Sequence, residues 1–139
     1  MKGIRIALVL FLVVILAGVA GSLIAQEKAP QTHVTYIYNN TDQITFEGVV
    51  QEVKDYKCPV SGTVGSHIVV KGNNNDLIEI HLGPAAFMKD YEMILHNGDK
   101  VRVVGAKFDF EGKPALMAKT VRVGQETFTF RDEKGKPLW

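Results

Sequence analysis

Two histidines and one cysteine are the residues in this chain best suited to hold a metal ion. His67 lies in the apolar segment 66–71, His81 lies in the apolar segment 77–82, and Cys58 is the only cysteine. Imidazole nitrogens and a thiolate are ligands for zinc, copper and iron in proteins. None of the three belongs to a short ligand motif such as CxxC or HxxxH. A site therefore forms only if the fold brings the three side chains together.

The register of two strands decides whether the histidines meet. Apolar residues occupy the even positions of Leu77–Leu82, so His81 faces away from the core together with Glu79. If the turn before this strand has an odd number of residues, His67 stands opposite His81, with Cβ atoms about 5 Å apart. An even-numbered turn would place His67 opposite Leu82 instead.

These residues give two expected sets of contacts and one structural alternative. The expected metal ligands are His67, His81 and Cys58, and the expected ligand-binding residues are His67, His81, Glu79 and Tyr56. Other candidates for a third metal ligand are Glu79, Met88 and His96. In the alternative, each histidine hydrogen-bonds a neighbouring loop or carboxylate and holds a corner of the barrel, and the cysteine is a small buried side chain.

The surrounding pattern predicts an all-β domain with one helix. Five strand-like runs are separated by turn signals: Ile44–Lys54, Ser66–Lys71, Leu77–Leu82, Lys100–Phe110 and Ala115–Val123. A helix is expected between the third and fourth, from Pro84 to the Asn97-Gly98 stop. This order is that of the OB-fold, a five-stranded Greek-key barrel.

Other features refine this barrel. Gly48 and Gly105 fall where tightly coiled strands must bend, and a bulge is expected near each. Residues 127–139 are expected to form a C-terminal hairpin on the outside of the barrel. Residues 26–43 are expected to be a linker leading into an edge strand or a loosely docked arm, and residues 44–139 the OB-fold domain.

The N-terminus predicts export. Lys2 and Arg5 precede an apolar run and a small-residue site at Gly21, Ser22 and Ala25, which is typical of a signal peptide cleaved after residue 25. Alternatively, residues 4–24 stay as a membrane anchor, the only part expected to touch a membrane. We therefore expect a periplasmic or secreted protein, or one anchored in the inner membrane and facing the periplasm.

Charge and motifs exclude other classes of function. Residues 26–139 carry 14 basic and 15 acidic side chains, and such a near-neutral domain lacks the positive field that drives nucleic-acid binding. The aromatic residues that could stack on bases are better explained by packing: Tyr36, Tyr38, Tyr56, Phe108 and Phe110. No Ser-His-Asp set, phosphate loop or workable carboxylate pair is present, so we expect no enzyme.

The chain resembles a family of small exported bacterial OB-fold proteins. The resemblance rests on "SHIVVK", "IEIHLGPAAFM", "NGDKVRVVGAKFDFEGKPALMAKTVRVG" and "RDEKGKPLW", and it extends to the C-terminal domain of the magnetosome proteins MamS and MamX. It implies an envelope accessory protein near iron, haem or redox chemistry, with His67 and His81 at the positions of the family's histidines. CxxCH is absent, so covalent c-type haem is not expected. The HxxxY motif of the similar haem chaperone CcmE is absent as well.

The expected function is therefore that of a non-enzymatic binding or accessory protein of the bacterial cell envelope. Its cofactor would be a transition metal, and its partner another envelope protein. A protein or oligosaccharide adaptor that uses the barrel face is the first alternative, and a module for single-stranded nucleic acid is the second.

Overall fold

The computed structural model describes residues 36–139, which belong to one compact unit. The signal peptide or anchor expected in residues 1–25 and the first part of the linker lie outside this range. Within residues 36–139, no helix has the length and apolarity needed to cross a membrane.

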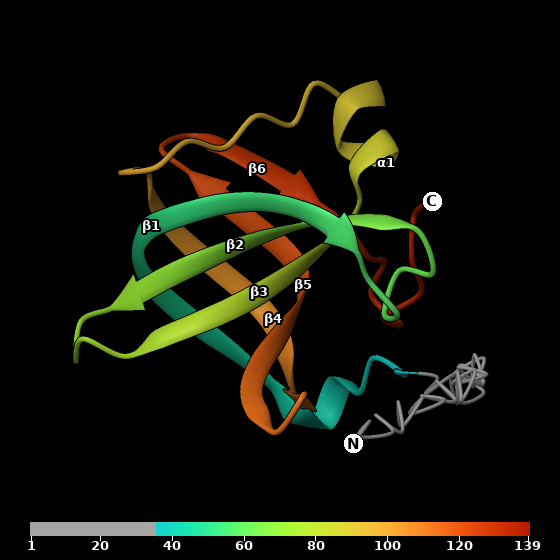
Figure 1. The fold of residues 1–139 in the computed structure, drawn as a ribbon, viewed down its shortest axis with the longest axis horizontal. Coiled ribbons are helices and arrows are strands. Elements are labelled where there is room, and N and C mark those ends of the chain that lie inside the picture. Colours follow the sequence, from blue (N-terminus) through green and yellow to red (C-terminus); the bar gives the residue numbers. More distant parts are fainter. Residues whose placement is uncertain (1–35) are drawn as a thin grey trace, which may run out of the picture. The chain divides into compact units, whose positions relative to one another are not determined.

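The strands form the closed barrel of an OB-fold. Six strands follow a short 3-10 turn at Asn40–Asp42: β1 (Gln43–Lys57), β2 (Val64–Gly72), β3 (Leu77–Pro84), β4 (Lys100–Phe110), β5 (Lys113–Val123) and β6 (Glu126–Thr129). The sheet order is β3-β2-β1-β4-β5-β6, and a parallel pairing of β3 with β5 closes the ring (Figure 1). Closure removes the exposed edges that an open five-stranded sheet would leave.

The barrel interior is filled by the apolar positions of every strand. The central side chains have at most 1% of their surface exposed: Val50, Ile68, Val70, Ile80, Leu82, Val103, Leu116, Ala118, Val121 and Phe130. Ile80 and Leu82, two of the residues expected to face inward on β3, are among them, and the third, Ile78, is partly buried against the same cluster.

Two glycines allow the strands to approach closely where the barrel bends. A Cβ atom at Gly48 would lie 2.2 Å from the Lys71 carbonyl oxygen, and one at Gly105 would lie 2.5 Å from that of Met117. The register shifts after Val50 in β1 and at Gly105 in β4. The expected bulges are therefore present near both glycines.

The helix is shorter than the sequence predicted. α1 spans only Ala85–Asp90, because Glu92 adopts a left-handed φ of 52° and the Met93 N–H bonds back to the Met88 carbonyl. Phe87 and Met88 still close one end of the barrel. Tyr91 and Ile94, which lie beyond the end of α1 but within the predicted helix, are exposed.

The C-terminal segment folds back over the outside of the barrel. β6 pairs with β5, and a turn from Asp132 to Gly135 then returns the chain so that Arg131 pairs with Pro137. In Figure 1 the dark red terminus lies beside the green loop between β1 and β2. Residues of both segments line one small cavity.

The chain before β1 is packed against the barrel. Tyr38 is buried against Ala106 and Met117, and the Tyr36 ring meets the Phe108 ring edge-on at 5.2 Å. These aromatic rings are thus engaged in internal packing.

Candidate metal centre

The two histidines stand opposite each other on adjacent strands. Five residues, Gly72–Asp76, separate the paired residues Lys71 and Leu77, and His67 pairs with His81. Their ring centroids are 4.5 Å apart and the planes are perpendicular. The odd-numbered turn is therefore the correct alternative.

Both histidines are buried although they point away from the barrel interior. His67 has 1% and His81 3% of its surface exposed. Tyr56 stacks on the His67 ring at 3.9 Å, and Phe108 and Phe110 pack edge-on against His81 at 5.0 and 4.5 Å. The two histidines are therefore not ordinary surface residues, because aromatic side chains of β1 and β4 cover them.

Cys58 completes a cluster of three donors. It directly follows β1, and its loop is fixed by bonds from the Cys58 N–H to the Thr63 carbonyl and from the Gly62 N–H to the Cys58 carbonyl. Its Sγ lies 3.4 Å from Nδ1 of His81. The donor atoms of Cys58, His67 and His81 all lie within 4.8 Å of one another.

This spacing is close to that of a metal site. Ligands about 2.0–2.3 Å from a single ion lie roughly 3.4–4 Å from one another. Small side-chain rotations would therefore bring the three donors into one coordination sphere.

Burial keeps all three donors in their neutral forms. It lowers the pKa of His81 to about 3, with repulsion from His67 as the second cause. Burial also lowers the pKa of His67, and it raises the pKa of the Cys58 thiol although backbone hydrogen bonds from Ser61 and Val60 oppose this. Neutral imidazoles are the form that binds metal ions.

The carboxylate of Glu79 faces Nε2 of His81 and is in a position to orient its ring. Its Oε1 lies 3.8 Å from Nε2 of His81, on the opposite side of the ring from Cys58. The Tyr56 hydroxyl donates a short hydrogen bond to Oε1, and Lys54 Nζ lies 3.0 Å from Oε2. Burial raises the pKa of Glu79, but these two donors outweigh it and lower the pKa overall.

This arrangement resembles the usual support of a metal-binding histidine, but the 3.8 Å separation is longer than a hydrogen bond. Such a histidine binds the ion through one ring nitrogen and presents the N–H of the other to a carboxylate. His81 would use Nδ1 for the ion and Nε2–H for Glu79.

Two ring nitrogens lack the partners that buried polar atoms normally have. Neither Nδ1 of His67 nor Nε2 of His81 has a hydrogen-bond partner among residues 36–139. Leaving such atoms unpaired costs about 1–3 kcal/mol each. A ligand for His67 would remove one of these costs.

A small cavity adjoins the donors. Its volume is about 10 Å³, and its walls include Cys58, Ser61, Gly65, His67, His81, Arg131 and Trp139. This is close to the smallest space that holds one water-sized occupant. The cavity suits a single ion and leaves little room for a further molecule.

The other proposed third ligands lie elsewhere. Met88 belongs to the barrel interior, and His96 is on an exposed loop after α1. The cluster therefore contains the two expected histidines, Cys58, Glu79 and Tyr56, but neither of these two residues.

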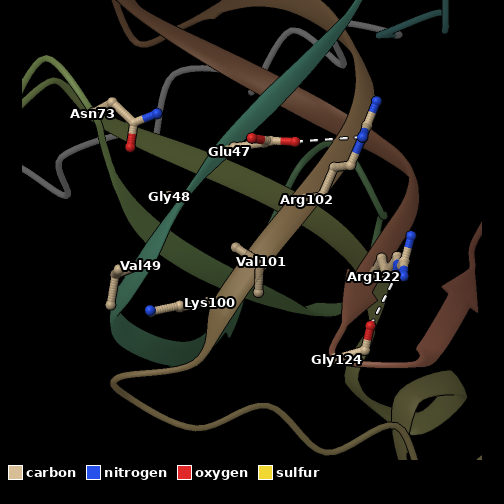
Figure 2. A pocket seen from close by; sticks show the side chains of 9 residues that line it. All are labelled: Glu47, Gly48, Val49, Asn73, Lys100, Val101, Arg102, Arg122 and Gly124. Carbon is tan, nitrogen blue, oxygen red and sulfur yellow. Dashed lines mark hydrogen bonds and ion pairs between the residues drawn. The ribbon is translucent and has the colours of Figure 1, made fainter.

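A larger open groove lies away from the three donors. Its volume is about 470 Å³, and it runs over β1, β4 and β5 (Figure 2). Arg102 Nη1 lies 3.5 Å from Glu47 Oε1, and Arg122 Nε donates to the Gly124 carbonyl at 3.0 Å. Two of the three cationic side chains that line this groove therefore already have partners, and the third is Lys100.

The sequence patterns did not identify the residues that cover the site. Trp139 packs on Gly83 of β3, and the buried Arg131 lies between the rings of Tyr38 and Trp139, 5.4 and 5.0 Å from their centroids. The motif "RDEKGKPLW" contains both covering residues, and it could have indicated them because an arginine and a terminal tryptophan are suited to cation–π stacking.

Comparison with protein families identifies the family to which the chain belongs. The family model described as "MamS/MamX magnetosome protein family" matches residues 42–128, a range that contains every donor of the cluster. The chain belongs to this family. A comparison with curated proteins gave no significant match.

Among solved structures, the chain is similar to one titled "Structure and Conformational Change of a Replication Protein A Heterotrimer Bound to ssDNA". The two are 19% identical with a TM-score of 0.45, and the match covers 60% of this chain and 57% of the other. The chain thus matches little more than half of that protein.

Proposed function

We propose that this member of the MamS/MamX family binds one transition-metal ion between Cys58, His67 and His81 and acts as a non-enzymatic metal-handling protein of the cell envelope. The observation that carries the proposal is the burial of three donor side chains within 4.8 Å of one another. Membership in a magnetosome protein family is consistent with such a role.

A purely structural role explains the cluster less well. A buried cysteine can serve as a small apolar side chain, and a histidine can fill a corner. That explanation leaves Nδ1 of His67 buried without a partner in residues 36–139. The carboxylate of Glu79, 3.8 Å from Nε2 of His81, also lies where the second nitrogen of a metal-binding histidine needs a partner.

The size of the cavity favours holding an ion over catalysis. Catalytic metal sites keep one coordination position open for water or substrate. The cavity of about 10 Å³ has space for the ion and for little else. We therefore assign the site to metal storage, transfer or electron exchange.

A buried ion needs a route in and out. Trp139 and the loop after Cys58 line the cavity from outside, so one of them must move. A groove of about 410 Å³ borders the Glu79 side of the cluster and is lined by Lys54, Tyr56 and the β4–β5 hairpin. An envelope partner that docks there would lie next to the residues that support His81.

Metal content of the purified protein tests this proposal. The exported chain is stripped of metal, offered Cu(I), Zn(II) or Fe(II) under anaerobic conditions, and analysed for bound metal after desalting. We expect about one ion per chain, and at least tenfold weaker binding in Cys58→Ser, His67→Asn and His81→Asn. His96→Asn is the matched control, because His96 is exposed and outside the cluster. If the protein binds none of the three metals, the proposal is wrong.

A further inference from the structure

We infer that the ion is copper, bound as Cu(I), and that Met117 is an additional ligand. This inference rests on the proposed metal site and adds its selectivity. Four observations carry it: the types of donor, the number of donors, the net charge of the site and the position of Met117.

The donors are soft and few. A cysteine thiolate with two imidazoles is the trigonal set of copper electron-transfer sites, which often have a weak axial methionine. Structural zinc is almost always held by four ligands in a tetrahedron. The structure gathers three such donors, Cys58, His67 and His81, around a cavity too small for added water. Cu(I) accepts three ligands readily.

The charge of the buried site favours a monovalent ion. One thiolate and two neutral imidazoles sum to one negative charge, and the buried Arg131 in the cavity wall adds one positive charge. A monovalent Cu(I) therefore leaves a smaller excess of positive charge than Zn(II) or Fe(II) would, in a site whose donors are at most 3% exposed, and a buried net charge is costly. Glu79 cannot fully compensate it, because the ammonium of Lys54 already lies 3.0 Å from its carboxylate.

Strand pairing places Met117 beside His81. In the parallel pairing that closes the barrel, Ile80 pairs with Leu116 and His81 pairs with Met117. Ile80 and Leu116 both lie in the barrel interior, so the next pair points to the opposite face. Met117 is 1% exposed and belongs to a buried cluster with Tyr38 and Ala106. Val60 packs against this cluster and also lines the cavity of the three donors. Its thioether is therefore a soft donor on the correct face.

Anaerobic competition with chelators of known affinity tests the inference. Cu(I) is used because nearly every nitrogen and sulfur site prefers Cu(II) to Zn(II), so a preference for Cu(II) would say little about this site. Cu(I) and Zn(II) are each titrated against their own chelator. We expect Cu(I) to bind at least 100-fold more tightly than Zn(II) and to remain diamagnetic. We expect Met117→Leu to weaken Cu(I) binding about tenfold, whereas Met88→Leu, a matched change inside the barrel, leaves it unchanged.

The outcomes separate the two proposals. Tighter binding of Zn(II) or Fe(II) than of Cu(I), with the same three side chains required, would overturn copper selectivity and leave the metal site intact. Equal Cu(I) affinity in Met117→Leu and Met88→Leu would remove Met117 from the site. Binding of none of the metals would overturn the proposed function itself.

Discussion

The sulfur of Cys58 lies 3.4 Å from Nδ1 of His81, although the two residues are 23 positions apart in the sequence. Burial favours the neutral thiol and the neutral imidazole. The thiol can donate its proton toward Nδ1 when the single ring proton of His81 is on Nε2, facing Glu79. This tautomer is the one that a metal ion on Nδ1 requires.

The buried histidines make the metal-free protein sensitive to acid. The pKa of His81 is about 3 in the folded protein, against about 6.5 in the unfolded chain. Above pH 6.5 both states are neutral, and below it only the unfolded state takes up the proton. The stabilisation is therefore lost as the pH falls from 6.5 toward 3, and the lowered pKa of His67 acts in the same direction.

Urea denaturation of metal-free protein measures this effect. We expect the free energy of unfolding to fall more steeply between pH 6.5 and 4.5 in the wild type than in His81→Asn, with a difference of about 1–2 kcal/mol. Parallel curves for the two proteins would show that His81 is protonated equally easily in both states.

Glu79 is expected to be a positioning residue for the metal site. Glu79→Gln keeps the size of the side chain but removes the charge that faces Nε2 of His81. We expect metal affinity to fall by about 10–100-fold, with one ion still bound at saturation. Glu52→Gln, an exposed change on β1, is the control. Equal affinity in both variants would show that Glu79 does not act through His81.

The C-terminal tryptophan is expected to protect the site. Trp139→Ala removes the ring that packs on Gly83 and Arg131. In metal-free protein, we expect a thiol reagent to label Cys58 about tenfold faster, because local opening then needs less free energy. Leu138→Ala is the matched control, since Leu138 is an exposed neighbour.

Two results of this labelling experiment would count against the protective role. The first is unchanged labelling in Trp139→Ala. The second is an equal acceleration in both variants. Urea midpoints measured alongside show whether faster labelling reflects local opening or loss of the whole fold.

Gly48 is expected to be essential for the closed barrel. An added Cβ would overlap the Lys71 carbonyl of the adjacent strand at 2.2 Å, so β1 and β2 would have to separate. We expect Gly48→Ala to destabilise the protein by about 3 kcal/mol or more, whereas the exposed Glu52→Ala costs under about 0.5 kcal/mol. Comparable urea midpoints for the two variants would show that the strands adjust easily.

The strand pattern and turn signals were enough to predict the barrel, and they reduced the pairing of the histidines to two alternatives that the number of turn residues decides. Alternating apolar residues defined the two faces of β3, and the five-residue turn set the register that joins His67 to His81. Both signals are local, so a single sequence contains them. The helix was overestimated because apolar spacing continues beyond Glu92, where the backbone turns left-handed.

Burial of the site could not be predicted in the same way. The histidines are covered by the β4–β5 hairpin and by a C-terminal segment about 50 residues beyond His81. The position of Met117 depends on the parallel closure between β3 and β5. Such contacts between distant segments leave no periodic trace in either one.

X-ray absorption of the copper-loaded protein tests the central claim most directly, because it counts the sulfur and nitrogen neighbours of the ion. The account predicts one sulfur from Cys58 about 2.2–2.3 Å from the ion and two imidazole nitrogens at about 2.0 Å, with the short sulfur distance lost in Cys58→Ser. An ion surrounded only by nitrogen and oxygen, and unchanged in Cys58→Ser, would contradict it.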